Sequence, residues 1–183
     1  MSSRSLQGAV KTAVAVATAA AFALTAAPAH AASDDPDPSV WTTLSKTYQA
    51  TAKYGYEAFA AGGGYMRTDT CADDLAEGGM GYHYVNLANA VSPPDPQKPA
   101  ALLYADGFKD EYTGESDFGG GRKLVAVEWM VKDTGQTPAP TLFGQTFQKG
   151  LFPGYFTLHA WIYKPNPKGL FAPWNPEVVC PKP

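Results

Sequence analysis

Leu124-Val125-Ala126-Val127-Glu128-Trp129-Met130-Val131 (residues 124–131) is the stretch that decides the fold, because its β-branched and aromatic residues predict a long strand over 122–132. Side chains alternate between the two faces of a strand. One face therefore carries Ala126, Glu128 and Met130, and the other carries Val125, Val127 and Trp129. A buried carboxylate costs free energy unless it is paired or binds something, so Glu128 indicates either a polar core network or a site.

Four further segments have the composition of strands, at residues 80–86, 100–105, 142–148 and 155–164. Turns rich in proline and glycine separate them, and no second helix pattern falls between them, which disfavours parallel βαβ units. We therefore predict an α+β fold with a curved, mainly antiparallel β-sheet of about five strands and a helix packed on one face.

The predicted helix covers residues 38–61. Asp37 suits the N-cap, Pro38 suits the first helical position, and the glycines at 62–64 end the pattern. Apolar positions recur at steps of three and four: Trp41, Leu44, Tyr48, Ala52, Gly55 and Phe59. We expect this amphipathic stripe to face the sheet.

The N-terminus has the pattern of a secretory signal peptide over residues 1–31. Arg4 and Lys11 precede an uncharged, mostly apolar run, and Ala29-His30-Ala31 has the small-x-small pattern of a cleavage site. An uncleaved anchor is disfavoured because no stop-transfer segment follows. We expect a secreted, extracellular protein with a disordered acidic leader at 32–37 and a single globular domain at 38–183.

Charge and composition exclude some partners. The chain carries a net charge of −3, and its basic residues are scattered without a run. Binding to nucleic acid or to anionic lipid is therefore not expected, and no segment after residue 31 has membrane-spanning length. A small molecule, a metal ion or an extracellular partner stays open.

The two cysteines, Cys71 and Cys180, most simply form one disulfide in an exported protein. That bond would tie the proline-rich tail, which we expect to be extended from residue 164 onward, to the segment after the helix. The rival interpretation is a pair of thiolate metal ligands, which the absence of a neighbouring Cys or His disfavours.

Two histidines after residue 31 also interrupt strand-like runs. His83 lies in the run 79–86 and His159 in 155–163. Strand alternation places His83 opposite Tyr82 and Tyr84. It places His159 with Tyr155, Thr157, Trp161 and Tyr163. His83, Glu128 and His159 are thus predicted to point away from the helix, towards a concave face rimmed by Tyr and Trp.

Two neutral imidazoles and one carboxylate form a three-ligand set typical of zinc and non-haem iron sites, so a divalent metal ion is the cofactor we consider. The close His spacing of strong metal motifs is missing. A metal-free acid–base pair, with Glu128 holding His159, stays open, as does a plain hydrogen-bonded core network. If the protein is an enzyme, metal-assisted hydrolysis or oxidation is the class we expect.

The aromatic residues supply a second functional hypothesis, a non-catalytic interaction or carbohydrate-binding module that uses the C-terminal tail. Exposed aromatic rings stack on sugars and flat ligands. The candidate contact residues are Tyr82, Tyr84, Trp161, Tyr163 and Trp174. The alternative is that the tail's aromatic side chains pin it to the sheet, as a segment with little regular pairing requires.

Several blocks together resemble a group of secreted or lipoprotein-type actinobacterial proteins that has no established activity. The main blocks are residues 79–86 (GMGYHYVN), 124–129 (LVAVEW) and 158–176 (LHAWIYKPNPKGLFAPWNP), followed by Cys180. The resemblance implies export and a single domain, and it is compatible with a site at His83, Glu128 and His159.

Overall fold

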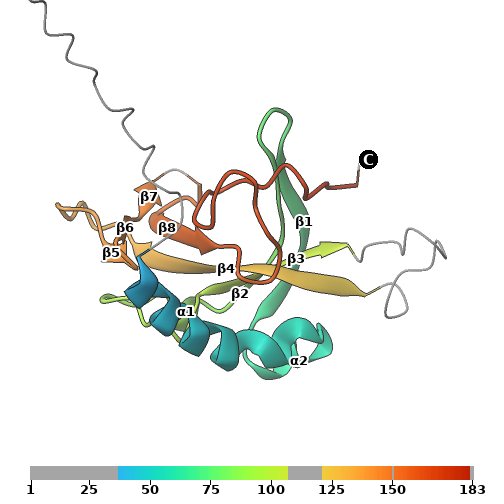
Figure 1. Ribbon diagram of the computed structural model, residues 1–183, viewed down its shortest axis with the longest axis horizontal. Coiled ribbons are helices and arrows are strands. Elements are labelled where there is room, and N and C mark those ends of the chain that lie inside the picture. Colours follow the sequence, from blue (N-terminus) through green and yellow to red (C-terminus); the bar gives the residue numbers. More distant parts are fainter. Residues whose placement is uncertain (1–36, 107–120, 150, 182–183) are drawn as a thin grey trace, which may run out of the picture. The chain divides into compact units, whose positions relative to one another are not determined.

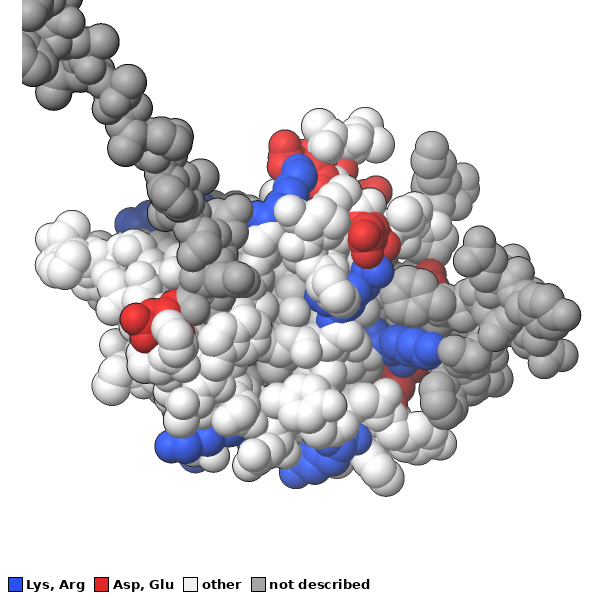
Figure 2. Space-filling view, in the orientation of Figure 1, with Lys and Arg blue, Asp and Glu red and all other residues white. Residues whose placement is uncertain are grey.

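The computed structural model describes residues 37–106, 121–149 and 151–181. The predicted signal peptide and residues 32–36 of the leader lie outside these ranges. No helix among the described residues is long and apolar enough to cross a membrane. On the face drawn in Figure 2, lysines and arginines are scattered and separated by uncharged surface.

The fold is α+β, as predicted, with helices packed on a curved antiparallel sheet of six strands (Figure 1). The strand order is β1-β2-β3-β4-β8-β7. The strands are β1 (Met66–Asp74), β2 (Gly78–Val85), β3 (Ala101–Asp106), β4 (Arg122–Lys132), β7 (Gln148–Lys149) and β8 (Tyr155–Ala160). A separate pair consists of β5 (Thr141–Leu142) and β6 (Gln145–Thr146), and a 3-10 turn, η2, covers Leu87–Asn89.

One strand was missed, and two strand predictions were wrong in detail. β1 was missed because it is an edge strand with a polar sequence and mostly exposed residues, so it lacks an apolar alternation. The predicted strand 142–148 consists instead of three two-residue strands. The predicted strand 155–164 ends at Ala160, because the amide of Trp161 donates to Leu170 O in the tail rather than to a neighbouring strand.

The helical segment begins as predicted but is not continuous. It comprises α1 (Pro38–Thr51), a 3-10 turn η1 (Ala52–Gly55) and α2 (Ala58–Gly62). The carboxylate of Asp37 accepts a hydrogen bond from Ser39 N at 2.8 Å, so Asp37 is the N-cap.

The predicted apolar stripe was wrong except at Leu44, which is buried. Trp41, Tyr48 and Phe59 are 47%, 48% and 57% exposed. The other buried positions of the segment are Thr47, Thr51, Tyr54 and Ala60. Burial of the two threonines is possible because both hydroxyls are hydrogen-bonded: Thr47 donates to Pro96 O at 2.8 Å, and Thr51 donates to Thr47 O at 2.7 Å. A hydrophobicity pattern does not reveal such pairing.

The two faces of the sheet carry separate cores. The helix side packs Tyr84, Tyr104 and Trp129 with Leu44 of α1. The opposite side packs Leu103, Ala126 and Met130 with three tail residues, Trp161, Trp174 and Val178. Figure 1 shows the helices on one side of the sheet and the tail looping over the other.

One residue departs from strict alternation. The pairing of β3 with β4 shifts between Leu103 and Tyr104, which face Ala126 and Leu124. This β-bulge places Val125 in the tail-side core, although the sequence pattern predicts it on the same face as Val127.

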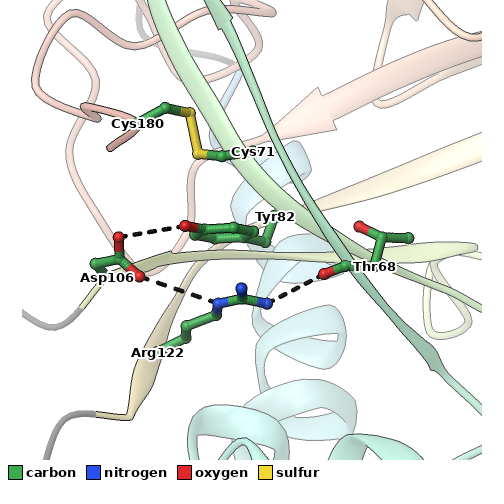
Figure 3. Close-up of a disulfide and its surroundings, with 6 residues drawn as sticks. All are labelled: Thr68, Cys71, Tyr82, Asp106, Arg122 and Cys180. Carbon is green, nitrogen blue, oxygen red and sulfur yellow. Dashed lines mark hydrogen bonds and ion pairs between the residues drawn. A yellow bond between two sulfur atoms is a disulfide. The ribbon is translucent and has the colours of Figure 1, made fainter. Parts of the chain in front are cut away.

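A disulfide and a glycine run hold the tail on the sheet. Cys71 of β1 is bonded to Cys180, so the predicted pairing is confirmed (Figure 3). Gly79 forms a β-bridge with Asn175 of the tail, and a Cβ on Gly79 would lie 2.7 Å from Val178 O. Glycine is therefore required at position 79 for the close approach of the tail.

Candidate metal centre

Strand register brings Glu128 and His159 together. In the pairing of β4 with β8, Glu128 lies directly opposite His159. Both side chains lie on the face away from the helix, as predicted. The shortest approach joins His159 Nε2 to Glu128 Oε1 at 3.4 Å.

His83 reaches the same place from two strands away. It lies on β2, opposite Leu103 of β3, while Glu128 of β4 lies opposite Ala101. Ala101 contributes only a methyl group to β3 beside Glu128. His83 Nε2 lies 3.6 Å from Glu128 Oε2, so each carboxylate oxygen faces one histidine.

The three side chains are close enough to share one ion. Their candidate ligand atoms all lie within 4.8 Å of one another. Metal–ligand bonds of about 2.0–2.1 Å at tetrahedral angles separate donor atoms by about 3.3 Å. Each histidine lies near that distance from one carboxylate oxygen, His159 at 3.4 Å from Oε1 and His83 at 3.6 Å from Oε2, and both separations are long for direct hydrogen bonds.

Several polar atoms of this cluster are buried without a hydrogen-bond partner. Glu128 is 1% exposed and His159 is 2% exposed. Among the residues that the structure describes, three buried side-chain atoms lack a hydrogen-bond partner: Glu128 Oε2, His159 Nε2 and Thr157 Oγ1. All three belong to the same face of β4 and β8, which indicates that this place needs a further group.

Burial also sets the protonation of the cluster. It raises the pKa of Glu128 to about 8, against a smaller lowering by the nearby Thr157 hydroxyl. It lowers the pKa of His83 to about 4, against a backbone hydrogen bond to Gly81, and that of His159 to about 3, with His83 adding to the effect. Without an ion, both imidazoles are therefore neutral at pH 7, and the Glu128 carboxyl group is protonated in most molecules. The short contacts are thus not ion pairs.

Neutral imidazoles are ready to donate a lone pair, and a bound cation would stabilise the ionised carboxylate. Two imidazoles and a carboxylate suit zinc and ferrous iron better than magnesium or calcium, which prefer oxygen ligands. The residues present therefore fit a divalent transition-metal ion.

The aromatic contact candidates do not form one platform. Tyr82 and Tyr84 lie in the helix-side core, as strand alternation predicts. Tyr163 also lies on that side, because β8 has ended, and its ring stacks on Tyr48 of α1 at 5.0 Å between centroids. Trp161 is 3% exposed and donates to Ala172 O, and Trp174 packs in the tail-side core. The two tail tryptophans pin the tail to the sheet.

A second polar cluster, which the sequence did not reveal, lies on the helix side. The Glu57 carboxylate accepts hydrogen bonds from Arg67 Nη1 at 3.1 Å, from the backbone amide of Arg122 at 3.0 Å and from the Tyr84 hydroxyl. Arg122 donates to Thr68 O and to the Tyr84 hydroxyl, both at 3.1 Å. Its guanidinium lies 3.3 Å from the centre of the Tyr82 ring (Figure 3).

Cavities open elsewhere on the described surface. One of about 780 Å³ is lined by Glu57, Tyr84 and Arg122 among others, and one of about 470 Å³ by Trp41 and tail residues. Neither is lined by His83, Glu128 or His159.

Comparisons with protein-family models, curated proteins and solved structures gave no match to this chain.

Proposed function

We propose that this protein binds one divalent transition-metal ion, zinc in the first place, through His83, Glu128 and His159. The observation that carries the proposal is the group of buried, unpartnered polar atoms at ligand-like spacing. A core network would place hydrogen bonds between these atoms, whereas an ion accounts for both the spacing and the missing partners.

The place of action that we propose is outside the cytoplasm, in line with the predicted signal peptide. The Cys71–Cys180 disulfide supports an oxidising compartment. The deep burial of the ligands favours tight retention of the ion and access for small molecules only, so we do not expect a macromolecular substrate.

Metal analysis of the protein tests the proposal. The chain is exported by its own signal, purified without a histidine tag and analysed by mass spectrometry for bound metals. We expect about one ion per chain, and loss of that ion in His83→Ala and His159→Ala. Asp69→Asn is the matched control, because Asp69 is an exposed carboxylate on β1, remote in strand order from β4 and β8.

Absence of any ion, together with a melting temperature that zinc, copper and iron salts leave unchanged, would sink the proposal. Metal that persists in both histidine variants would show that binding occurs elsewhere on the chain.

A further inference from the structure

Thr157 lies beside the candidate metal centre and has no role in the three-ligand set. It precedes His159 by two residues on β8, so both side chains point to the same face. Its cross-strand partner is Met130, which lies next to the Glu128–His159 pair along the same two strands. Thr157 is therefore a diagonal neighbour of Glu128.

The Thr157 hydroxyl is fully buried and has no hydrogen-bond partner among the described residues. Leaving a buried hydroxyl unpaired costs free energy, and valine would fill the same shape without that cost. Met130 and Trp161 on this face offer apolar side chains. The Glu128 carboxyl lies near enough for the Thr157 hydroxyl to lower its pKa, but the two groups do not meet hydrogen-bond geometry. The hydroxyl is therefore left available to a further polar group.

The ligand count indicates what that group is. The described residues contribute three ligands to the group, whereas zinc in proteins takes at least four. An open coordination position is occupied by water or by a small ligand in such sites. We propose, on the basis of the proposed function, that the Thr157 hydroxyl hydrogen-bonds to a water or hydroxide ion that completes the coordination of the metal.

The charge balance of the site agrees with this assignment. A divalent cation and one carboxylate leave a single positive charge in a buried place, which a hydroxide or another small monoanion would neutralise. The apolar surroundings and the packed tail restrict the ligand to a few atoms. Thr157 is in this view a positioning residue, and the centre is a site with an exchangeable ligand rather than a closed structural site.

Two variants of the full secreted chain test the role of Thr157. Thr157→Val removes the hydroxyl and keeps the shape, and Thr157→Ser keeps the hydroxyl. Zinc affinity is measured by competition with a chromophoric chelator, and crystal structures of the zinc-loaded proteins show the coordination. We expect an oxygen ligand within about 2.2 Å of zinc and within hydrogen-bond distance of Thr157 Oγ1. We expect a roughly tenfold weaker affinity in Thr157→Val and near-normal affinity in Thr157→Ser.

The two proposals fail in different ways. If the unaltered protein binds no zinc, the proposed function fails. If zinc binds but its fourth ligand is a protein atom, or Thr157 bonds only to the Glu128 carboxylate, the role of Thr157 is overturned. Equal zinc affinity in Thr157→Val and the unaltered protein would overturn it as well. Thermal unfolding of the metal-free variants checks that each one folds.

Discussion

Two polar clusters lie on opposite faces of the same sheet, and they differ in how their polar atoms are satisfied. On the helix side, the Glu57 carboxylate accepts three hydrogen bonds, and Arg122 donates to Thr68 and Tyr84. On the tail side, Glu128 faces two histidines at 3.4 and 3.6 Å, and one of its oxygens has no partner.

Protonation separates the clusters further. The pKa of Tyr84 is raised to about 12 by burial and by its hydrogen bond to Glu57, so its hydroxyl remains a donor over the physiological range. The pKa of Glu128 rises to about 8 by burial, and no described cation lies beside it. The helix-side cluster is thus complete within the protein, whereas the tail-side cluster leaves buried polar atoms unpartnered, which an ion would complete under our proposal.

The largest expected effect is a loss of zinc affinity that occurs on changing the tail-side glutamate but not the helix-side one. Glu128→Gln removes a charged ligand with little change of shape, so zinc affinity should fall by roughly 100-fold or more. Glu57→Gln, the matched change on the helix side, should leave it unchanged. Competition titration measures both, and a large loss in Glu57→Gln would show that the ion sits on the wrong face for our proposal.

The next effect concerns pH in the metal-free protein. Burial raises the pKa of Glu128 from 4.5 to about 8 in the folded protein. The folded state therefore keeps its full stability below pH 4.5 and loses stability as pH rises towards and through 8. Metal-free Glu128→Gln should therefore exceed the unaltered protein in stability by an amount that grows from pH 4.5 upward and reaches on the order of 4 kcal/mol by pH 8.

Urea unfolding from pH 5 to 8 in the presence of a chelator measures this difference. The two histidines are present in both proteins. Their lowered pKa values reduce the stability of the protein only as pH falls below 6.5, so they do not cause a difference that grows with rising pH. A difference that stays flat across this range would mean that Glu128 is paired in the metal-free protein.

On the helix side we expect a smaller change, a loss of stability rather than the gain expected for Glu128→Gln. Arg122→Met removes hydrogen bonds to Thr68 and Tyr84 and the stacking on Tyr82, so it should destabilise the protein by about 2 kcal/mol. Because this cluster needs no ion, the loss should be the same with and without zinc. A loss confined to the zinc-loaded form would contradict the independence of the two clusters.

The smallest effect lies at the edge of the helix-side cluster. The Arg67 side chain is 57% exposed and pairs with Glu57 and Asp69. Solvent screens such pairs, so Arg67→Ala should cost less than about 1 kcal/mol by urea unfolding. A cost equal to that of Arg122→Met would mean that pairing rather than burial determines the strength of this cluster.

Local patterns predicted the parts of the fold with strong side-chain alternation. β2, β3, β4 and the start of β8 are buried and apolar, and they lie where the sequence predicts. β1 is exposed and polar, so its pairing with β2 left no mark in hydrophobicity. The helix stripe failed for a related reason, since Thr47 and Thr51 are buried through hydrogen bonds to Pro96 and Thr47 that only the folded chain supplies.

The candidate site divides in the same way. Strand alternation allowed His83, Glu128 and His159 to share a face, and strand order and register, which the sequence left open, brought them together. Thr157 was on that face by the same rule, but only its missing partner singles it out. Glu57 lies in the turn before α2 and Arg122 begins β4, far away in the sequence, so no local pattern links them.

The sequence by itself determined the α+β class, the pairing of the two cysteines and the face that each polar residue shares with its neighbours on its own strand. The class and the faces follow from backbone geometry, which acts locally along the chain. The disulfide follows from the number of cysteines, because two cysteines can pair in only one way. Only the tertiary structure decided that Glu128 lies opposite His159 and that His83, two strands away, reaches the same carboxylate. Register and strand order depend on packing between distant segments, and that packing turns three polar residues on one face into a candidate centre for a single ion.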